Sequence, residues 1–331
     1  MKKKLLITVA ALSLVALAGC GTSGKSAKTD DKDLVVRIAD NNDVCGAPQQ
    51  IAEVKGFFKE EGIKIEKVNI GKLDNLGAIN ADKIDASNSL IGSVIQPLAN
   101  GAKIKITTGL HTGCLQILTR DDGSIKTAAD LKGKKIGVPS VAGSPATFAR
   151  RVLSDAGLNV DLEKGDVEFI AYDASALGEV LANGTVDAIA ASDPVPDILS
   201  EQYHFATLVN SATDPKYKDE YCCVAYVSEK LAKEHPEAAK HFTIALQKAA
   251  KWVGEHPEET AKLQFEHKFV DGDLNRNEKL LASYNFIPSY QGAYDAFAIV
   301  GKDLQKIGIL DKDVDVKAVQ KASFVKFDGV E

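Results

Sequence analysis

Beyond its first twenty residues the sequence lacks any run of basic residues and any second apolar segment long enough to span a membrane. The whole chain has a formal charge of −6. Because its leader carries three lysines and no acidic residue, the remainder has a charge of −9. An acidic chain without basic runs is a poor partner for nucleic acids and for anionic lipid surfaces. These absences argue against a nucleic-acid-binding protein and against a protein that crosses the membrane several times.

The sequence also lacks the short motifs of common enzyme classes. It contains no Gly-x-Ser-x-Gly elbow, no Walker phosphate loop and no His-Glu-x-x-His zinc motif. The Gly143-Ser144 pair has no evident base nearby in the sequence. Asp43 and Asp193 could form a facing acid pair, but each is more typical of a residue that caps a helix or orients a loop. We therefore expect no catalytic residue, no cofactor and no enzyme.

The first nineteen residues have the pattern of a lipoprotein signal peptide. Lysines at positions 2–4 precede an apolar run over residues 5–18, and the leader ends in Gly19 and Cys20, which resembles a bacterial lipobox. Cys20 is then the expected lipidation site, and the polar residues 20–32 predict a flexible tether. We expect an extracytoplasmic protein anchored to the cell membrane by its lipid. The alternative is an ordinary secretory signal in which this cysteine has no role.

One stretch of the chain has the pattern of a small anion site. Residues 135–138 predict a short strand and residues 139–143 a loop of small residues. Ser144 is the expected N-cap of the following helix, with Pro145 at its first helical position. The start of a helix presents free backbone N–H groups at the positive end of the helix dipole. The stretch is therefore suited to a small anion or a polar headgroup.

Two patterns occur once in each half of the chain. Residues 61–65 and 156–160 each predict the end of a helix, a glycine and a strand. Residues 82–86 and 183–188 each predict a turn and a strand that contains Asp-Ala. The simplest interpretation is a pair of similar α/β lobes that begin near Leu34 and Leu115, followed by a strongly helical segment after residue 228.

Several further elements follow from local patterns. One helix is expected from Pro48 to the stop at Gly62, and another over residues 177–182. Residues 109–112 are expected to form a loop after a strand at 103–108. In the helical segment, Pro236 and Pro257 should each begin a helix, and apolar residues from Phe242 to Val253 recur with helical spacing.

Polar loops follow four of the expected strands, two in each lobe. They cover residues 41–46, 87–89, 140–144 and 192–194. In open parallel α/β sheets, ligands bind beyond the carboxyl ends of the strands. Facing lobes would place these loops around one cleft, and their hydroxyl, amide and N–H groups predict a small polar or anionic ligand.

The remaining cysteines admit two interpretations. Disulfides or buried thiols are the ordinary explanation for an even number of cysteines in an exported protein, here Cys45, Cys114, Cys222 and Cys223. A bolder interpretation combines three of them with His111 as soft metal ligands, but their spacing matches no zinc motif. We expect no metal and take His111 as a ligand contact. Adjacent strand residues point to opposite faces, so only one of Cys222 and Cys223 should face the cleft.

Together these patterns give one set of expected ligand-binding residues. The set contains Asn41, Cys45, Gly46, Asn88, Ser89, His111, Thr112, Ser140, Gly143, Ser144, Asp193, Tyr221 and Cys222.

Several motifs resemble one family of proteins. Residues 56–63 (GFFKEEGI) and 130–138 (DLKGKKIGV) are similar to motifs in solute-binding proteins of ABC importers of the nitrate, sulfonate and taurine group, and Asp193-Pro194 and residues 229–252 also fit. The resemblance implies the type II periplasmic-binding-protein fold, which has two α/β lobes, a hinge and a ligand cleft. It implies a monomer that captures a small solute by lobe closure and delivers it to the permease and ATPase of an ABC transporter.

The same resemblance implies a division of the chain and an alternative function. Residues 33–117 and 219–331 would form the first lobe and residues 118–218 the second. Enzymes that make the thiamine pyrimidine share the fold, but they hold a pyridoxal cofactor on a lysine with a histidine four residues later, where this sequence has Ser89 and Ser93. An enzyme of that kind and a sensor domain without a transport role are the alternatives.

Overall fold

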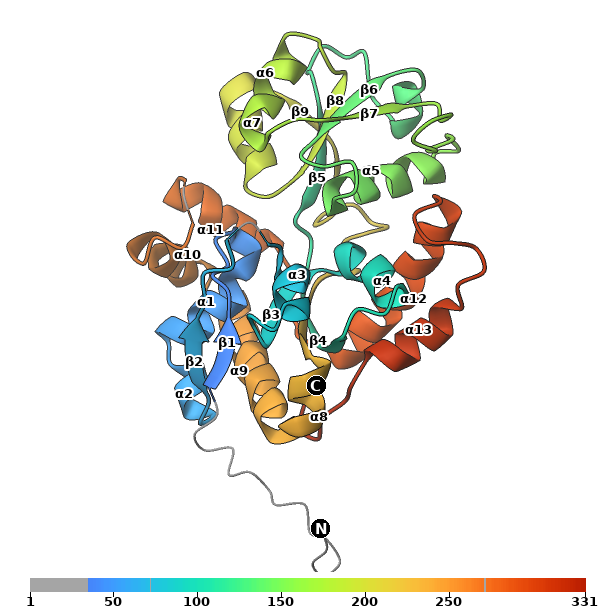
Figure 1. Cartoon of the computed structure of the whole chain (residues 1–331). Coiled ribbons are helices and arrows are strands. Elements are labelled where there is room, and N and C mark those ends of the chain that lie inside the picture. The colour runs from blue at the N-terminus through green and yellow to red at the C-terminus, as the bar shows by residue number, and fades with distance from the viewer. Residues whose placement is uncertain (1–34, 72, 271) are drawn as a thin grey trace, which may run out of the picture. The chain divides into compact units, whose positions relative to one another are not determined.

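The computed structural model describes residues 35–71, 73–270 and 272–331 (Figure 1). The predicted signal peptide at 1–19 and the tether at 20–32, including the lipidation site Cys20, lie outside the described residues. Within the described ranges, no helix is both long enough and apolar enough to cross a membrane. The described residues form a mixed α/β structure with three separate sheets, which divide between two lobes.

The first lobe is built on a two-stranded and a three-stranded sheet. The smaller sheet pairs β1 (Val35–Ile38) in parallel with β2 (Lys64–Lys67). In the other, β10 (Tyr221–Ser228) lies between β3 (Ala86–Leu90) and β4 (Ile104–Thr112) and is antiparallel to both. A late segment of the chain therefore supplies the central strand of a sheet whose two edges come from its first third (Figure 1).

Helices cover the sheets of the first lobe, and the longest confirms a predicted apolar stripe. Phe242, Leu246 and Val253 are fully buried where α9 packs against α1 and β4. Pro236 and Pro257 each lie at the start of a helix, as expected. The helices of this lobe are η2 (Val44–Gly46), α1 (Ala47–Val54), α2 (Phe57–Glu60), α3 (Asn75–Asn80), α4 (Ile91–Ala99), α8 (Glu229–Glu234), α9 (Pro236–Glu255), α10 (Pro257–Glu266), α11 (Leu274–Ser283), α12 (Tyr290–Lys306) and α13 (Val316–Ser323).

The second lobe has a single five-stranded sheet with the order β7-β6-β8-β5-β9. β6 runs parallel to β7 and β8, whereas β5 runs antiparallel to β8 and β9. Its elements are β5 (Leu115–Thr119), η3 (Ala128–Leu131), β6 (Lys135–Val138), α5 (Ser144–Asp155), β7 (Glu168–Ala171), η4 (Ala174–Ala176), α6 (Leu177–Ala182), β8 (Ala188–Ser192), α7 (Val195–Tyr203) and β9 (Ala206–Asn210). The predicted strand at 135–138 and the helix after it are confirmed.

A glycine in the left-handed region ends a helix in each lobe, as the first repeated pattern predicted. Gly62 has φ +72° and Gly157 has φ +85°. The N–H of the next residue then donates to a carbonyl five residues earlier, at 2.9 Å from Ile63 to Phe58 and at 3.0 Å from Leu158 to Leu153. These bonds define the same Schellman ending in both lobes.

The strand that was expected directly after Gly157 is absent. β7 begins only at Glu168, after a turn within residues 159–167. Side chains hold this turn, because the Asp161 carboxylate accepts the backbone N–H groups of Glu163 and Lys164 at 2.9 and 2.8 Å. Only in the first lobe does a strand, β2, follow the glycine closely.

The second repeated pattern has the same geometry in both lobes. Asp85 exchanges two bonds with Arg37: its N–H donates to the Arg37 carbonyl at 2.8 Å, and its carboxylate accepts the Arg37 backbone N–H at 2.9 Å. Asp187 does the same with Lys135, at 2.8 and 3.0 Å. Each aspartate thus joins the strand that follows it to another strand of its lobe.

Three local predictions are wrong, for two reasons. Residues 87–89 and 109–112 were expected to lie in loops, but they belong to β3 and β4 because β10 pairs with both strands. The single helix expected between Pro48 and Gly62 is divided into α1 and α2 at Gly56, which has φ +81°.

Candidate functional site

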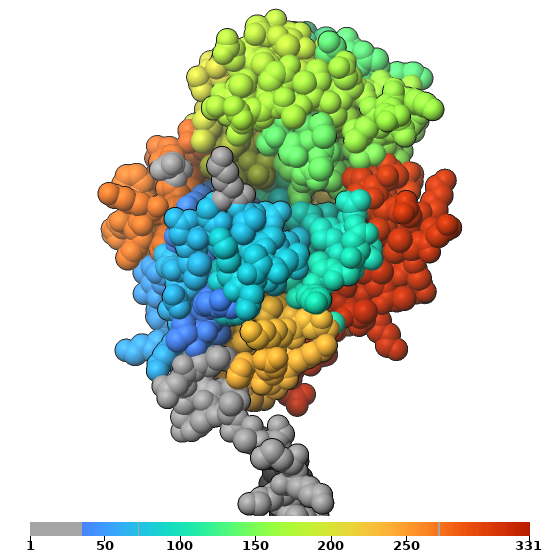
Figure 2. Space-filling view, in the orientation of Figure 1, coloured from blue at the N-terminus to red at the C-terminus, as the bar shows by residue number. Residues whose placement is uncertain are grey.

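A cavity of about 230 Å³ lies between the two lobes, where Figure 2 shows a recess between the blue and the green parts of the chain. Its first-lobe wall comes from the loop after β1, from α3, β3 and α4, and from β10. Its second-lobe wall comes from the start of α5 and the end of β8. The lining residues are Asn41, Asp43, Cys45, Asn75, Asn88, Ser89, Leu90, Ser93, Ser144, Ser192, Asp193 and Cys223. Nearly all carry an amide, hydroxyl, carboxylate or thiol group, so the cavity suits a small polar ligand.

The structure brings part of the predicted site into this cavity. The predicted residues that line it are Asn41, Cys45, Asn88, Ser89, Ser144 and Asp193. The predicted residues outside its described lining are Gly46, His111, Thr112, Ser140, Gly143, Tyr221 and Cys222. Several of these residues shape the cavity wall from behind, as their contacts show.

Gly46 determines where the Asn41 side chain can lie. A Cβ atom at position 46 would be 2.5 Å from Cγ of Asn41, so a larger residue would displace that amide. The Asn41 amide donates to Oδ1 of Asn88 at 3.3 Å, and Gln50 donates to the Asn41 carbonyl at 2.6 Å. Asp43 closes the turn by accepting the Gly46 N–H at 2.6 Å. Gly46 therefore acts on the cavity through its neighbour.

Ser144 does not cap α5. Gly143 occupies the N-cap position, and the buried hydroxyl of Ser144 has no hydrogen-bond partner. Ser140 forms the turn before the helix, where its hydroxyl accepts the Ala142 N–H at 3.3 Å and its carbonyl accepts the Gly143 N–H at 3.1 Å. An unpartnered hydroxyl at a helix start inside a polar cavity is available to a ligand.

Asp193 is a buried carboxylate that links both lobes. Its oxygens accept from Gln116 Nε2 at 2.8 Å and from the Tyr284 hydroxyl at 2.7 Å, and its side chain is only 3% exposed. Burial, followed by the charge of Asp197, raises the pKa of Asp193 to about 7. Near neutral pH this group can therefore either donate a proton in a hydrogen bond or accept one.

The two arginines of α5 do not reach the cavity. Arg151 forms two bonds with Glu220, at 2.7 and 2.8 Å, and one with Asp303 at 2.9 Å. Arg150 donates to the carbonyls of Val160 and Ile307. Among the described residues, no lysine or arginine lines the cavity between the lobes. A ligand anion must therefore be bound by hydroxyl, amide and backbone groups.

The four cysteines of the described residues converge from distant parts of the chain, and of the two ordinary explanations, disulfides and buried thiols, the structure shows thiols. All four are free thiols, and Sγ of Cys114 lies 2.6 Å from Sγ of Cys222. Cys223 lines the cavity, whereas Cys222 lines a separate small apolar cavity next to α4 and α5. The residue that faces the cleft is thus Cys223 and not the predicted Cys222. The pairing of β10 with β4 is shifted on both sides of Cys223, an irregularity that the sequence does not show.

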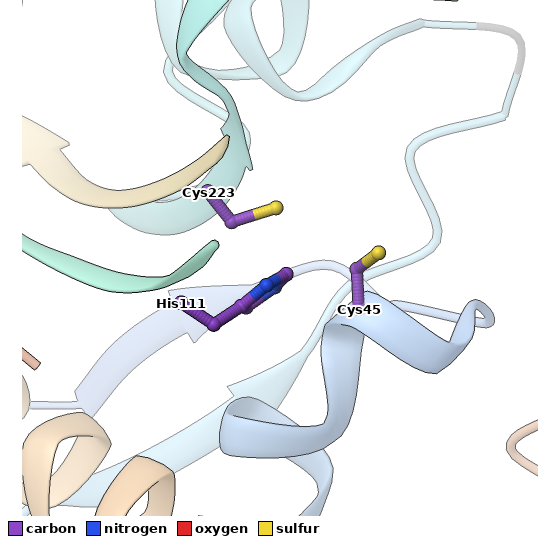
Figure 3. Close-up of side chains that lie close together, drawn as sticks. All are labelled: Cys45, His111 and Cys223. Atoms are coloured by element: carbon purple, nitrogen blue, oxygen red, sulfur yellow. The ribbon is translucent and has the colours of Figure 1, made fainter. Parts of the chain in front are cut away.

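His111 lies directly behind the cavity wall. One nitrogen of its ring and the sulfurs of Cys45 and Cys223 all lie within 4.8 Å of one another, and Figure 3 shows both sulfurs beside the imidazole ring. Tyr284 stacks on the ring with a centroid distance of 5.3 Å. Burial disfavours the charged imidazole, but the neighbouring Cys223 thiolate favours it, and the pKa of His111 is raised well above its ordinary value.

Two further predicted residues have contacts within the protein. The Thr112 carbonyl accepts a bond from Nδ1 of His111 at 3.0 Å. The Tyr221 hydroxyl donates to the Ile287 carbonyl, and its ring lies where a Cβ atom at Gly109 or Gly292 would be. Thr112 and Tyr221 therefore contact other parts of the first lobe and do not line the cavity.

Six lining residues were missing from the expected set: Asp43, Asn75, Leu90, Ser93, Ser192 and Cys223. Asp43 and Ser192 lie within two of the predicted loops, so extending those loops to all their polar residues would have included them. Asn75 and Ser93 face the cavity from α3 and α4, and no sequence pattern marks those helix starts as part of it.

Two α/β lobes with a polar cavity between them are the architecture of the periplasmic-binding-protein fold, and solved structures have the same fold. The alkanesulfonate-binding protein SsuA from Xanthomonas axonopodis pv. citri, bound to MOPS, matches with a TM-score of 0.70 at 19% identity, covering 88% of this chain and 98% of that one. The periplasmic nitrate-binding protein NrtA from Synechocystis PCC 6803 matches with a TM-score of 0.69 at 16% identity, covering 88% and 86%.

The chain belongs to the NMT1/THI5-like family, whose model matches residues 46–260. A putative aliphatic sulfonates-binding protein from Bacillus subtilis (strain 168) is 30% identical over 342 residues, which cover 98% of this chain and 96% of the relative. The resemblance drawn from the motifs at 56–63 and 130–138 is thereby confirmed.

Proposed function

We propose that this protein is the extracytoplasmic solute-binding component of an ABC importer, which captures a small polar solute between its lobes and delivers it to the permease. The observation that carries the proposal is the polar cavity walled by both lobes. A solute that contacts both walls favours the closed arrangement of the lobes, since it forms all its bonds only there. The match to a sulfonate-binding relative over nearly the whole chain supports the same role.

The cavity groups favour a small zwitterion with an anionic oxygen group and an amine. The unpartnered Ser144 hydroxyl at the start of α5 and the amides of Asn41 and Asn88 can donate to sulfonate or carboxylate oxygens. The carboxylates of Asp43 and Asp193 can accept from an ammonium group. Above pH 7, the approximate pKa of both Asp43 and Asp193, a purely anionic solute would leave two ionised carboxylates facing its charge, so a taurine-type solute fits better there than a simple sulfonate.

A comparison of three probes tests this proposal. We expect taurine to bind more tightly than ethanesulfonate or ethylamine, each of which has only one of the two charged groups. At a hundredfold excess over its Kd, the bound probe should stabilise the protein by about 2.7 kcal/mol, measured as a shift in melting temperature and by calorimetric titration. Binding of ethylamine as tight as that of taurine, or binding of none of the three, would contradict the assignment.

Substitution of two serines separates a ligand contact from a loop contact. Ser144→Ala removes an unpartnered hydroxyl from the cavity and should weaken taurine binding about fivefold, which corresponds to about 1 kcal/mol for one hydrogen bond. Ser140→Ala is the matched control on the exposed turn before α5 and should leave the affinity unchanged. Equal effects of both substitutions would place the solute elsewhere.

Several finer features complete the proposal. We infer that residues 33–117 and 219–331 form one lobe and residues 118–218 the other, and that the protein acts as a monomer anchored by a lipid on Cys20. Replacement of Cys20 by alanine should release the protein from membranes and abolish its labelling by a palmitate analogue. If this variant stayed bound to membranes and were still labelled by the palmitate analogue, lipidation at Cys20 would be contradicted.

The alternative of a thiamine-pyrimidine enzyme has little support from the cavity. At the positions where those enzymes carry a cofactor-binding lysine and a histidine, Ser89 and Ser93 line the wall, and the Ser89 hydroxyl pairs with the Tyr226 hydroxyl at 2.7 Å. A hydroxyl cannot form the Schiff base that a pyridoxal cofactor requires. Consumption of a pyridoxal compound by the purified protein would favour the enzyme, and solute-dependent signalling without uptake would favour a sensor.

A further inference from the structure

Three side chains with soft donor atoms meet at the inner wall of the cavity between the lobes. They come from η2, β4 and β10, and the donor atoms of Cys45, His111 and Cys223 lie within 4.8 Å of one another (Figure 3). Zinc–sulfur bonds of about 2.3 Å and zinc–nitrogen bonds of about 2.0 Å place the ligands of one ion at about this mutual separation. The three side chains therefore have the spacing of ligands that share one metal ion.

The three donors are held by the fold itself and not by mobile chain ends. His111 and Cys223 are directly paired across β4 and β10. Cys45 lies in the short helix that the Asp43 carboxylate caps at 2.6 Å. All three residues are buried, with exposed fractions of 0% for His111, 2% for Cys223 and 6% for Cys45. Preorganised donors of this kind lose little conformational entropy on binding an ion.

The imidazole has the orientation of a metal ligand. The Thr112 carbonyl lies 3.0 Å from Nδ1, and because a carbonyl oxygen can only accept, Nδ1 carries a proton. The other nitrogen, Nε2, is buried and has no hydrogen-bond partner. A metal-bound histidine commonly donates one ring N–H to a backbone carbonyl, which fixes the ring and leaves the second nitrogen for the ion. The unpartnered Nε2 is thus an independent indication of a missing ligand.

We propose that Cys45 Sγ, His111 Nε2 and Cys223 Sγ bind one thiophilic d10 cation, Zn²⁺ or Cu⁺, with a further coordination position open to the cavity. Thiolate and imidazole donors select such ions over magnesium or calcium. Two thiolates balance the charge of Zn²⁺, and the two thiol protons leave to solvent as the ion binds. Because Cys45 and Cys223 themselves line the cavity, the open position faces the space that a solute would occupy.

This site goes beyond capture of a solute and does not depend on it. A protein that binds the ion but no sulfonate, or the reverse, would separate the two proposals. With three protein ligands, the open position would be available to a donor atom of a cargo molecule or to water.

The other two cysteines supply a matched control. Cys114, Cys222 and Cys223 also lie within 4.8 Å of one another, but this group lacks an imidazole, and Cys114 and Cys222 already contact each other at 2.6 Å. Cys222→Ser changes a cysteine in this neighbourhood and keeps all three proposed ligands. Cys45→Ser and Cys223→Ser each remove one.

The test begins with Co²⁺, the spectroscopic substitute for Zn²⁺, added to the reduced, metal-free full chain without oxygen. We expect one equivalent to bind, with a thiolate-to-cobalt charge-transfer band in the near ultraviolet and with displacement by Zn²⁺. A parallel competition between the protein and bicinchoninate for Cu⁺ distinguishes the two cations. A folded wild-type protein that binds neither cobalt, zinc nor Cu⁺ would overturn the proposal.

The variants decide which residues hold the ion. Cys45→Ser and Cys223→Ser should each weaken binding at least tenfold, and Cys222→Ser should leave it unchanged. A loss in Cys222→Ser as large as that in Cys45→Ser would assign the ion to other residues and overturn the proposed set.

A measurement on the wild type does not depend on the folding of any variant. Alkylation by iodoacetamide is mapped by mass spectrometry with and without the ion that the titrations show to bind, Zn²⁺ or Cu⁺. The ion should slow alkylation at Cys45 and Cys223. Unchanged alkylation at both sites would favour a metal-free pair of protonated His111 with a thiolate and would reject the metal site.

Discussion

The two lobes share their local geometry but differ in what they present to the cavity. Gly62 and Gly157 end helices in the same way, and Asp85 and Asp187 join strands by the same two bonds. Both lobes contribute hydroxyls and a carboxylate to the cavity, whereas, among the described residues, the amides and the two thiols backed by an imidazole come from the first lobe. The shared features form the scaffold, and the chemistry that selects a ligand comes from the residues that the lobes do not share.

The largest effect is expected from Arg151, a buried residue whose ion pairs join α5 of the second lobe to the first lobe. Arg151→Ala removes the cation that α5 holds against Glu220 and Asp303, while both carboxylates stay in place. The arginine side chain is only 6% exposed, so the loss should reduce the free energy of unfolding by about 3 kcal/mol or more.

Denaturant unfolding measures this change, and Arg151→Lys is its control. Lysine keeps the charge but cannot form the bidentate pair, so its loss should be intermediate. If Arg151→Ala were as stable as the wild type, these ion pairs would contribute nothing to the joining of the lobes.

A second effect, which depends on pH, is expected at Asp193, where second-lobe and first-lobe groups meet. Its pKa of about 7 exceeds the ordinary value near 4, so the folded state retains a proton that the unfolded chain releases. The contribution of this group to the free energy of unfolding is present at low pH. It is lost as the pH rises from near 4 to about 7, by at most about 1.4 kcal/mol per pH unit.

Asp193→Asn should remove that slope, because asparagine does not titrate but still offers partners to Gln116 and Tyr284. The measurement is the difference in unfolding free energy between variant and wild type from pH 4 to pH 8, in which the contributions of groups that do not interact with Asp193 largely cancel. Asp197, whose charge acts on Asp193, is replaced by asparagine in both proteins. A difference that stays constant over this range would mean that Asp193 is ionised throughout.

The smallest effect tests the equivalence of the two lobes directly. A Cβ atom at Gly62 or at Gly157 would meet nothing within 4 Å, so alanine at either position encounters only the backbone strain of a positive φ. We expect Gly62→Ala and Gly157→Ala each to destabilise the protein by about 1 kcal/mol, in thermal or denaturant unfolding. A difference between them of more than about 1 kcal/mol would show that the two helix ends are not energetically equivalent.

Much of the second lobe could be predicted from the sequence because its signals are local. The strand at 135–138, the helix start after Gly143 and the helix at 177–182 follow from apolar runs, a proline and glycines within a few residues. Even here the position of the cap was wrong by one residue, and that single residue decides that the Ser144 hydroxyl faces the cavity.

The first lobe was less predictable because its central strand comes from far along the chain. Ser87 to Ser89 have the composition of a loop, and only pairing with β10 makes them a strand. The hydroxyls of Ser89 and Tyr226, 137 residues apart, meet for this reason. The choice between Cys222 and Cys223 likewise depends on irregularities in pairing with β4, which no short window of sequence contains.

The position of β10 also determines when the site can exist. During synthesis the chain emerges from its N-terminal end, so β3 and β4 appear long before the strand that lies between them. Until β10 arrives, the edges of β3 and β4 lack their partner, and the Cys45 thiol has no Cys223 beside it. Pairing across such long loops is slow. A nascent first lobe therefore has an interval in which the groups proposed to hold a solute and an ion are not yet together, and its part of the cavity is complete only once the chain up to β10 has been made.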